Sequence, residues 1–141
     1  SYGGYLTAAA VCFAPGVFQA AIAASGYPDR VAMVQEQELR HIKQMEYKLG
    51  SFATHPEIYR KCSPIYWAKQ ATTPTFVLNG EGHLPRSEAS RNFANALEKE
   101  YKTVQYKAYA NEGYYVQSVV GTRQMWLDML AFLEKYLSDD A

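Results

Sequence analysis

The first five residues read SYGGY, and a run of small apolar residues, LTAAAV, follows directly at positions 6–11. A serine two residues before a glycine, with a helix of small residues after it, is typical of the second half of a nucleophile elbow, the G-x-S-x-G turn between a strand and a helix. Small residues suit this place because the helix must pass close to the turn. Its N-terminal N–H groups and dipole also favour a negative charge there. This start predicts a strand–turn–helix fold with Ser1 at the turn.

Strand and helix patterns alternate along the rest of the chain. Short apolar or alternating runs predict three strands, near residues 18–24, 75–79 and 103–109. Apolar residues at helical spacing predict helices over 6–13, 29–49 and 122–137, another that begins at Ser87, and a short mixed segment at 56–66. We therefore expect one domain over residues 1–141 with an α/β fold, in three α/β/α layers around about three parallel strands.

Loops at the carboxyl ends of parallel strands carry the chemistry in folds of this class. Three such loops are predicted here, SGY at 25–27, GEGH at 80–83 and NEGY at 111–114. All three should meet at one edge of the sheet. That edge is the predicted site.

Composition excludes several classes of function. The net charge is zero and the basic residues are scattered, so we expect no nucleic-acid partner. No apolar run approaches the roughly 20 residues that cross a bilayer, so we expect a soluble chain without a membrane span, with the cytoplasm the favoured location. The two cysteines, Cys12 and Cys62, are expected to be buried and reduced. No cofactor and no metal site is predicted.

The order of these motifs resembles the C-terminal part of the catalytic domain of prolyl-oligopeptidase-family serine peptidases, similar to dipeptidyl-peptidase-IV and acylaminoacyl-peptidase members. The resemblance rests on SYGGY at 1–5, GVFQAAIA at 16–23, PEIY at 56–59, SP at 63–64, TPT at 73–75, GE at 80–81, SEAS at 87–90 and NEG at 111–113. It implies a truncated α/β-hydrolase fold and cleavage of peptide or ester bonds through an acyl-enzyme. It also implies that the incoming strand, a second oxyanion donor and a β-propeller lie upstream of residue 1.

Carried over residue by residue, the family's triad is incomplete. Ser1 matches the nucleophile, and the backbone N–H of Tyr2 matches one oxyanion donor. The acid position falls on His83 in a shortened loop, and the base position falls on Tyr114. A serine hydroxyl needs a positioned base, and a tyrosine with a pKa of about 10 does not replace imidazole near neutral pH. We therefore expect the chain to be inactive, with a peptide or ester substrate only if it is active. The alternative is a non-catalytic binding or oligomerisation module.

Several other interpretations stay open. Ser1 is a relic, a nucleophile, or an N-terminal nucleophile that uses its own amine. His83 is a surface residue or a relocated base oriented by Glu81. His41, with Glu38 three residues before it, is part of a solvated helix face or of a metal site. The aromatic residues of the mixed segment, and the pair Tyr114-Tyr115, either fill core or line a ligand surface.

The family resemblance also predicts an unpaired strand edge. In the family, the strand near residues 18–24 lies beside the strand that leads into the nucleophile. That segment, FQAAIAA, has no charge or proline that would block pairing with another chain. We expect it and the bare apolar surface near Leu6, Val11 and Phe18 to form a homo-oligomer, most simply a dimer.

Overall fold

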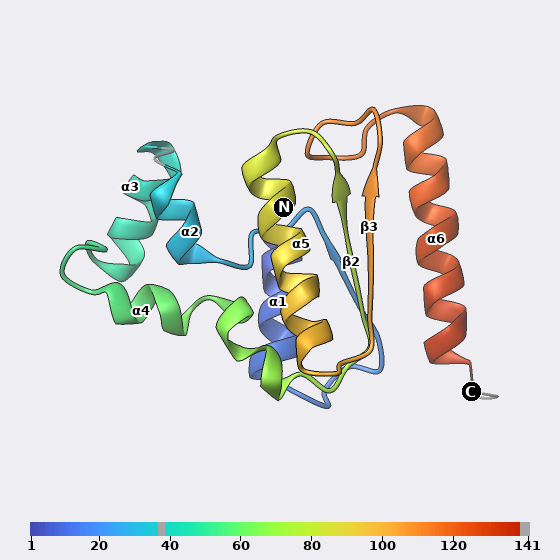
Figure 1. Ribbon diagram of the computed structural model, residues 1–141, viewed down its shortest axis with the longest axis horizontal. Helices are drawn as coiled ribbons and strands as arrows, with labels where there is room; N and C mark the ends of the chain where they lie inside the picture. Colours follow the sequence, from blue (N-terminus) through green and yellow to red (C-terminus); the bar gives the residue numbers. More distant parts are fainter. Residues whose placement is uncertain (37–38, 139–141) are drawn as a thin grey trace.

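The computed structural model describes residues 1–36 and 39–138. Its strands are β1 (Ala21–Ala24), β2 (Thr75–Gly80) and β3 (Val104–Tyr109), which form one parallel sheet in the order β1-β2-β3. Its helices are α1 (Tyr2–Phe13), α2 (Arg30–Gln35), α3 (Leu39–Leu49), α4 (Pro56–Lys61), the 3₁₀ segment η1 (Pro64–Gln70), α5 (Leu84–Lys99) and α6 (Val119–Leu137). Figure 1 shows the three strands running the same way, with α6 at one end of the molecule and α3 at the other.

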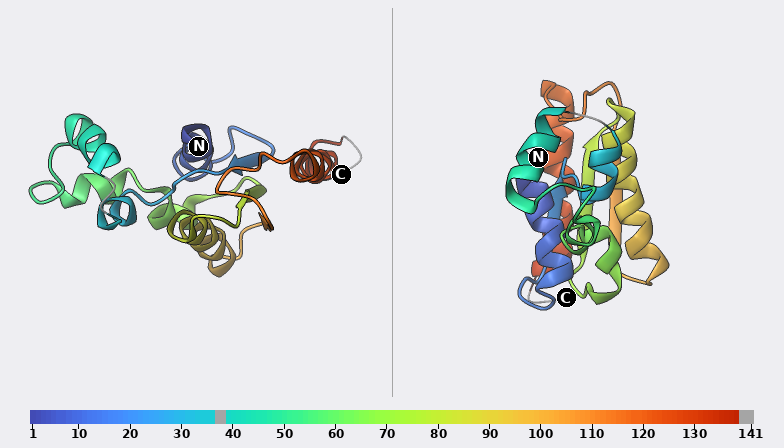
Figure 2. Two further views of the ribbon diagram at one scale, coloured as in Figure 1. Left: turned by 90° about the horizontal axis from the view of Figure 1, so that it is seen from above. Right: turned by 90° about the vertical axis from the view of Figure 1, so that its left-hand side faces the viewer.

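Two apolar clusters sandwich the sheet. Ala23 and Val77 share one face of the sheet, where they pack with Val11 of α1 and Phe93 of α5. On the opposite face Phe76 packs against Phe132 of α6, with ring centroids 5.5 Å apart. Helices therefore cover both faces, which confirms the predicted three-layer, truncated α/β-hydrolase arrangement (Figure 2).

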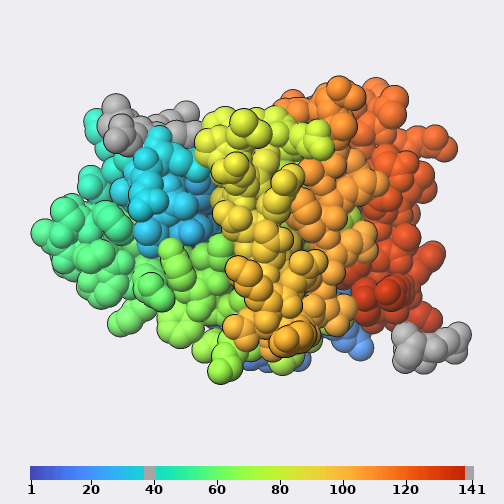
Figure 3. Space-filling view, viewed as in Figure 1, coloured from blue at the N-terminus to red at the C-terminus, as the bar shows by residue number. Residues whose placement is uncertain are grey.

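A third cluster lies beside the sheet and joins α2, α3 and α4. Its buried members are Tyr27, Met33, Met45, Tyr59 and Ala89. This cluster forms the lobe on the left of Figure 3, next to α5, which crosses the front of the molecule in yellow. Residues of α2 and α3 line a cavity together with Ser25, which follows β1 directly.

The structure corrects several boundaries. Helix α1 begins at Tyr2 rather than at residue 6, α5 at Leu84 rather than Ser87, and α6 at Val119 rather than at residue 122. The first strand is Ala21–Ala24 rather than 18–24 because pairing begins where the N–H of Ala21 donates to the Pro74 carbonyl. The helix predicted over 29–49 is two helices, α2 and α3. In one continuous helix, Met33 and Met45 would lie about 18 Å apart, too far to enter the same small cluster.

The predicted bare surface near α1 is correct for two residues and wrong for the third. Leu6 is 51% exposed and Phe18 is 55% exposed. Val11 is 2% exposed because it faces the sheet rather than solvent. Within the part of the chain that the structure describes, no helix is both long and apolar enough to cross a bilayer.

Candidate functional site

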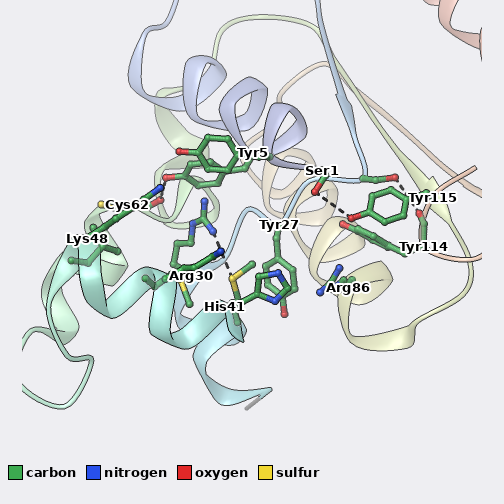
Figure 4. Close-up of a pocket in the computed structure, with 16 residues that line it drawn as sticks. Ser1, Tyr5, Tyr27, Arg30, His41, Lys48, Cys62, Arg86, Tyr114 and Tyr115 are labelled. Atoms are coloured by element: carbon green, nitrogen blue, oxygen red, sulfur yellow. Dashed lines mark hydrogen bonds between the residues drawn. The ribbon is translucent and has the colours of Figure 1, made fainter. Parts of the chain in front are cut away.

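A cavity of about 420 Å³ opens at the carboxyl end of the sheet, between the start of α1 and the lobe of α2 and α3 (Figure 4). Hydroxyl, aromatic and basic side chains dominate its lining. Its lining residues are Ser1, Tyr2, Tyr5, Ser25, Tyr27, Arg30, Met33, His41, Gln44, Met45, Lys48, Leu49, Cys62, Arg86, Tyr114 and Tyr115. The structure thus brings three of the predicted positions together, at Ser1, Tyr2 and Tyr114.

Ser1 sits immediately before α1, as its N-cap residue. Its ammonium group donates to the Ala24 carbonyl at 3.1 Å, and its Oγ accepts a hydrogen bond from the Tyr115 hydroxyl at 3.2 Å. Helix α1 passes so close to the end of β1 that a Cβ on Gly4 would lie 2.4 Å from the Ala24 oxygen. The close approach predicted for this glycine-containing turn is therefore present.

Tyr2 is the first residue of α1, so its N–H belongs to the first turn, which has no intrahelical acceptor. That is the position at which the sequence predicts an oxyanion donor. The Tyr2 ring stacks on Tyr5 with centroids 5.6 Å apart. The tyrosine side chain therefore contributes to the cavity wall independently of its backbone.

Tyr114, at the predicted base position, is buried and does not point its hydroxyl at Ser1. That hydroxyl donates a short hydrogen bond to the Gly26 carbonyl. Burial raises the pKa of Tyr114 to about 12, so the phenol stays protonated at neutral pH. Its neighbour Tyr115 contacts Ser1 instead. Neither tyrosine therefore offers Ser1 a proton acceptor equivalent to a neutral imidazole.

His83, at the predicted acid position, is exposed and is not among the residues that line the cavity. It is the N-cap residue of α5, with a left-handed backbone at φ 57°. The shortened loop turns directly into the helix at this point. The structure does not place His83 as a relocated base beside Ser1.

The backbone of the two neighbouring loops is tightly interlocked. The Gly80 N–H donates to the Tyr114 carbonyl at 2.9 Å, and the Gly82 N–H donates to the Glu112 carbonyl at 3.1 Å. The Ser25 hydroxyl donates to the same Tyr114 carbonyl at 3.1 Å. These contacts use main-chain atoms and the Ser25 hydroxyl, and none of them uses the side chain of Ser1, His83 or Tyr114.

Each strand-end loop contains one non-glycine residue with a left-handed backbone. These residues are Ser25 at φ 49°, His83 at φ 57° and Asn111 at φ 60°. Such a conformation costs on the order of 1 kcal/mol for an ordinary residue and concentrates at functional sites. The edge predicted from the sequence therefore retains the sharp turns of a binding edge.

Glu112, in the NEG motif, stabilises the turn before α6. Its carboxylate accepts from the N–H groups of Gln117 and Ser118 and from the Ser118 hydroxyl. The hydrogen bond from the Gln117 N–H and the two from Ser118 lower the pKa of Glu112. The motif thereby positions the turn that leads into α6.

The wall of the cavity formed by α2 and α3 contains residues that sequence reasoning missed. The guanidinium carbon of Arg30 lies 3.8 Å from the centroid of the Tyr5 ring, and the Lys48 ammonium lies 5.8 Å from that of Tyr2. The Tyr5 hydroxyl donates to the Cys62 carbonyl at 2.7 Å. A Tyr-x-x-Tyr spacing on a helix, at i and i+3, was the available signal for this aromatic surface.

The metal hypothesis gains no support from the geometry. His41 lines the cavity, whereas Glu38 lies outside the described residues. Among residues 1–36 and 39–138, no group of three or more histidine, cysteine or acidic side chains is placed to hold a metal ion. Cys12 is buried as expected, and burial raises its thiol pKa to about 12; Cys62 is only partly buried, and neither is in a disulfide.

Comparisons with known proteins agree with this arrangement. The sequence model of the prolyl oligopeptidase family matches residues 1–140. A curated relative, dipeptidyl peptidase family member 6 of Caenorhabditis elegans, is 26% identical over 99% of this chain and 20% of its own length. The chain therefore spans about a fifth of that relative.

Solved structures match over nearly the whole chain. Acylaminoacyl peptidase of Pyrococcus horikoshii superposes with a TM-score of 0.84 at 22% identity, over 96% of this chain and 23% of that protein. A puromycin hydrolase gives a TM-score of 0.85 at 18% identity, over 96% and 21% of the two chains. Dipeptidyl peptidase 4 of Porphyromonas gingivalis gives 0.78 at 19% identity, over 96% and 18%. These likenesses confirm the predicted fold.

Proposed function

Because this chain belongs to the prolyl oligopeptidase family, we propose that it is a serine-hydrolase segment that keeps the ligand cavity at Ser1 and does not turn over peptide or ester bonds. The observation that carries this proposal is the environment of the Ser1 hydroxyl. Its one described side-chain partner is Tyr115, and the base position holds the buried, protonated Tyr114. Peptides and esters, the substrate class of the family, are therefore bound here without being cleaved.

The energetic reason is the missing proton acceptor. A serine hydroxyl attacks a carbonyl only when a neighbouring base takes its proton. Loss of a triad member leaves about 10³ to 10⁴-fold acceleration over water, and that remnant depends on the oxyanion donors and on binding. The Tyr2 backbone N–H, next to Ser1, is one oxyanion donor of that kind. A donor without a base supports binding of an acyl group better than its cleavage.

The test is hydrolysis of an aminoacyl or short-chain p-nitrophenyl ester by the wild-type chain and by Ser1→Ala. We expect equal, background rates. The double variant Tyr114→His with His83→Asp should also stay at background, because residue 83 is outside the cavity lining. Turnover by the wild type that Ser1→Ala abolishes would overturn the proposal.

We also propose a self-association role, based on a different observation. Among the described residues, β1 pairs only with β2, and its other edge has no strand partner. The exposed side chains of Leu6 and Phe18 belong to α1 and to the loop between α1 and β1, both of which precede this strand in the chain. A second copy that pairs along this edge would cover it, since exposed apolar edges are templates for pairing.

Sedimentation at micromolar concentrations tests the assembly. We expect a dimer in the wild type and a shift toward monomer in Ile22→Lys, because Ile22 lies within β1. Gln105→Lys, at an exposed position of β3, serves as the control. A wild-type chain that stays monomeric contradicts the proposal.

A further inference from the structure

Aromatic and cationic side chains lie next to one another in the helical wall of the cavity. We define the cation–aromatic wall as Tyr2, Tyr5, Arg30 and Lys48, which come from α1, α2 and α3. Arg30 lies 3.8 Å from the Tyr5 ring centroid and 5.8 Å from that of Tyr2. Figure 4 shows Arg30 between Tyr5 and the lobe, on the side of the cavity away from Tyr115.

The two cationic groups of this wall face a cavity whose described lining is basic, polar and aromatic. None of the described residues that line the cavity is acidic. Asp29 accepts from the N–H groups of Val31 and Ala32 at the start of α2, and Glu36 accepts from the Tyr27 hydroxyl. These two nearby carboxylates are therefore engaged in local contacts. Within residues 1–36 and 39–138, neither Arg30 nor Lys48 forms an ion pair.

Arg30 also has hydrogen-bonding capacity left over. A guanidinium carries five N–H donors in a planar fork. Among the described residues, its side chain interacts with the Tyr5 hydroxyl and donates to the Met33 sulfur at 3.6 Å, a weak acceptor. The contact with the Tyr5 ring restricts the position of the guanidinium without using all of its donors. Such a fixed guanidinium is suited to binding a carboxylate through two parallel hydrogen bonds.

We propose that the cavity takes a peptide with an acidic side chain, whose carboxylate binds Arg30 and Lys48 while its backbone lies toward Ser1. This inference rests on the proposed ligand-binding function and specifies its ligand class. A partly enclosed site with walls of one charge concentrates ligands of the opposite charge. The tyrosine rings contact the aliphatic part of the ligand.

The test compares two matched probes by titration calorimetry at low ionic strength. The probes are acetyl-Ala-Ala-Glu-amide and acetyl-Ala-Ala-Gln-amide, which differ by one charge and have nearly the same shape. We expect the Glu peptide to bind about tenfold more tightly. The preference should shrink in high salt because exposed charges are screened. Arg30→Gln and Lys48→Gln should each reduce it, and Arg30→Lys should restore part of it.

Arg91→Gln is the matched control, since Arg91 is an exposed arginine on α5 that stacks on Tyr106 outside the cavity. The fold of Arg30→Gln is checked by circular dichroism. Its backbone N–H bond to the Ser63 hydroxyl does not depend on the side chain. Lys48→Gln gives a second, exposed site if the first variant is unstable. Equal binding of both peptides overturns this inference and leaves the proposed function standing. Binding of neither peptide overturns both.

Discussion

The two walls of the Ser1 cavity are built in different ways. The sheet wall, with Ser25, Tyr114 and Tyr115, is fixed by main-chain hydrogen bonds between strand-end loops and by the Ser25 hydroxyl. The guanidinium carbon of Arg86 lies 5.7 Å from the Tyr114 ring centroid on this side. In the helical wall the Arg30 guanidinium lies over the Tyr5 ring, and Arg30 and Lys48 contribute two cationic groups. The sheet wall has Tyr114 at the predicted base position, and the helical wall is rich in aromatic and cationic groups.

Under the proposed function, recognition and catalysis therefore depend on different parts of the framework. A change of the base to tyrosine leaves the Gly80 and Gly82 contacts in place, since these use only backbone atoms of residues 112–114. The cavity therefore keeps its form without a proton acceptor. The following predictions test the two walls separately.

The largest effect is expected at Gly80, the centre of the sheet wall. A Cβ there would lie 1.9 Å from the Gly113 oxygen. Gly80→Ala should lower the free energy of unfolding by about 3 kcal/mol. Gly113→Ala is the matched control, because a Cβ at that position meets nothing within 4 Å. Urea denaturation of both variants measures the difference. Similar stabilities would contradict the interlocked-loop description.

A smaller, pH-dependent effect is expected at Asp128, which ties α6 to β3 below the sheet wall. Its carboxylate accepts from Lys107 at 2.6 Å and from the Tyr109 hydroxyl at 2.7 Å. Burial alone would raise the pKa of Asp128, but the hydrogen bonds from Lys107, Tyr109 and Gln124 and the Lys107 charge outweigh it and lower the pKa. A lowered pKa in the folded state means that protonation destabilises the fold.

The contribution of Asp128 to stability is therefore fully present above the unfolded-state pKa of about 3.9. It is lost as the pH falls through the lower folded-state pKa. Asp128→Asn should cost about 1 kcal/mol at pH 7, because Lys107 is 40% exposed and the ion pair is screened. It should cost much less near pH 2. Thermal unfolding at both pH values checks this, and a cost that does not change with pH would contradict it.

The smallest effects distinguish the two tyrosines of the sheet wall. Tyr114→Phe removes a buried donor to the Gly26 carbonyl, which keeps the Ser90 hydroxyl as a second donor, so we expect a loss of about 1 kcal/mol. Tyr115→Phe removes an exposed hydrogen bond to Ser1 and should change stability by less than about 0.5 kcal/mol. Urea denaturation that ranks Tyr115→Phe as the more damaging change would contradict the burial assignment.

The sequence predicted the strands and the meeting of the strand-end loops, because buried parallel strands have short apolar runs with loops at their carboxyl ends. It did not predict the break between α2 and α3. Apolar spacing alone describes one face of a helix and does not show that Met33 and Met45 enter the same cluster. Only tertiary contacts determine that the helix must turn.

The sequence predicted some residues of the candidate site and missed others, again because tertiary contacts cannot be read from local patterns. Ser1, Tyr2 and Tyr114 were found by their place in motifs, and all three line the cavity. His83 was assigned by position in a shortened loop, and the structure places it at the N-cap of α5. Arg30 and Lys48 belong to no motif, and only the fold of the lobe brings them to Tyr5 and Tyr2.

The most direct measurement of the central claim is labelling of the chain with a fluorophosphonate probe. The probe reacts with an activated serine and needs no knowledge of substrate specificity. We predict no labelling of the wild type above the Ser1→Ala background at neutral pH, because the nearest described side-chain partner of Ser1 is the Tyr115 hydroxyl and Tyr114 stays protonated. Labelling of the wild type that disappears in Ser1→Ala would contradict this account.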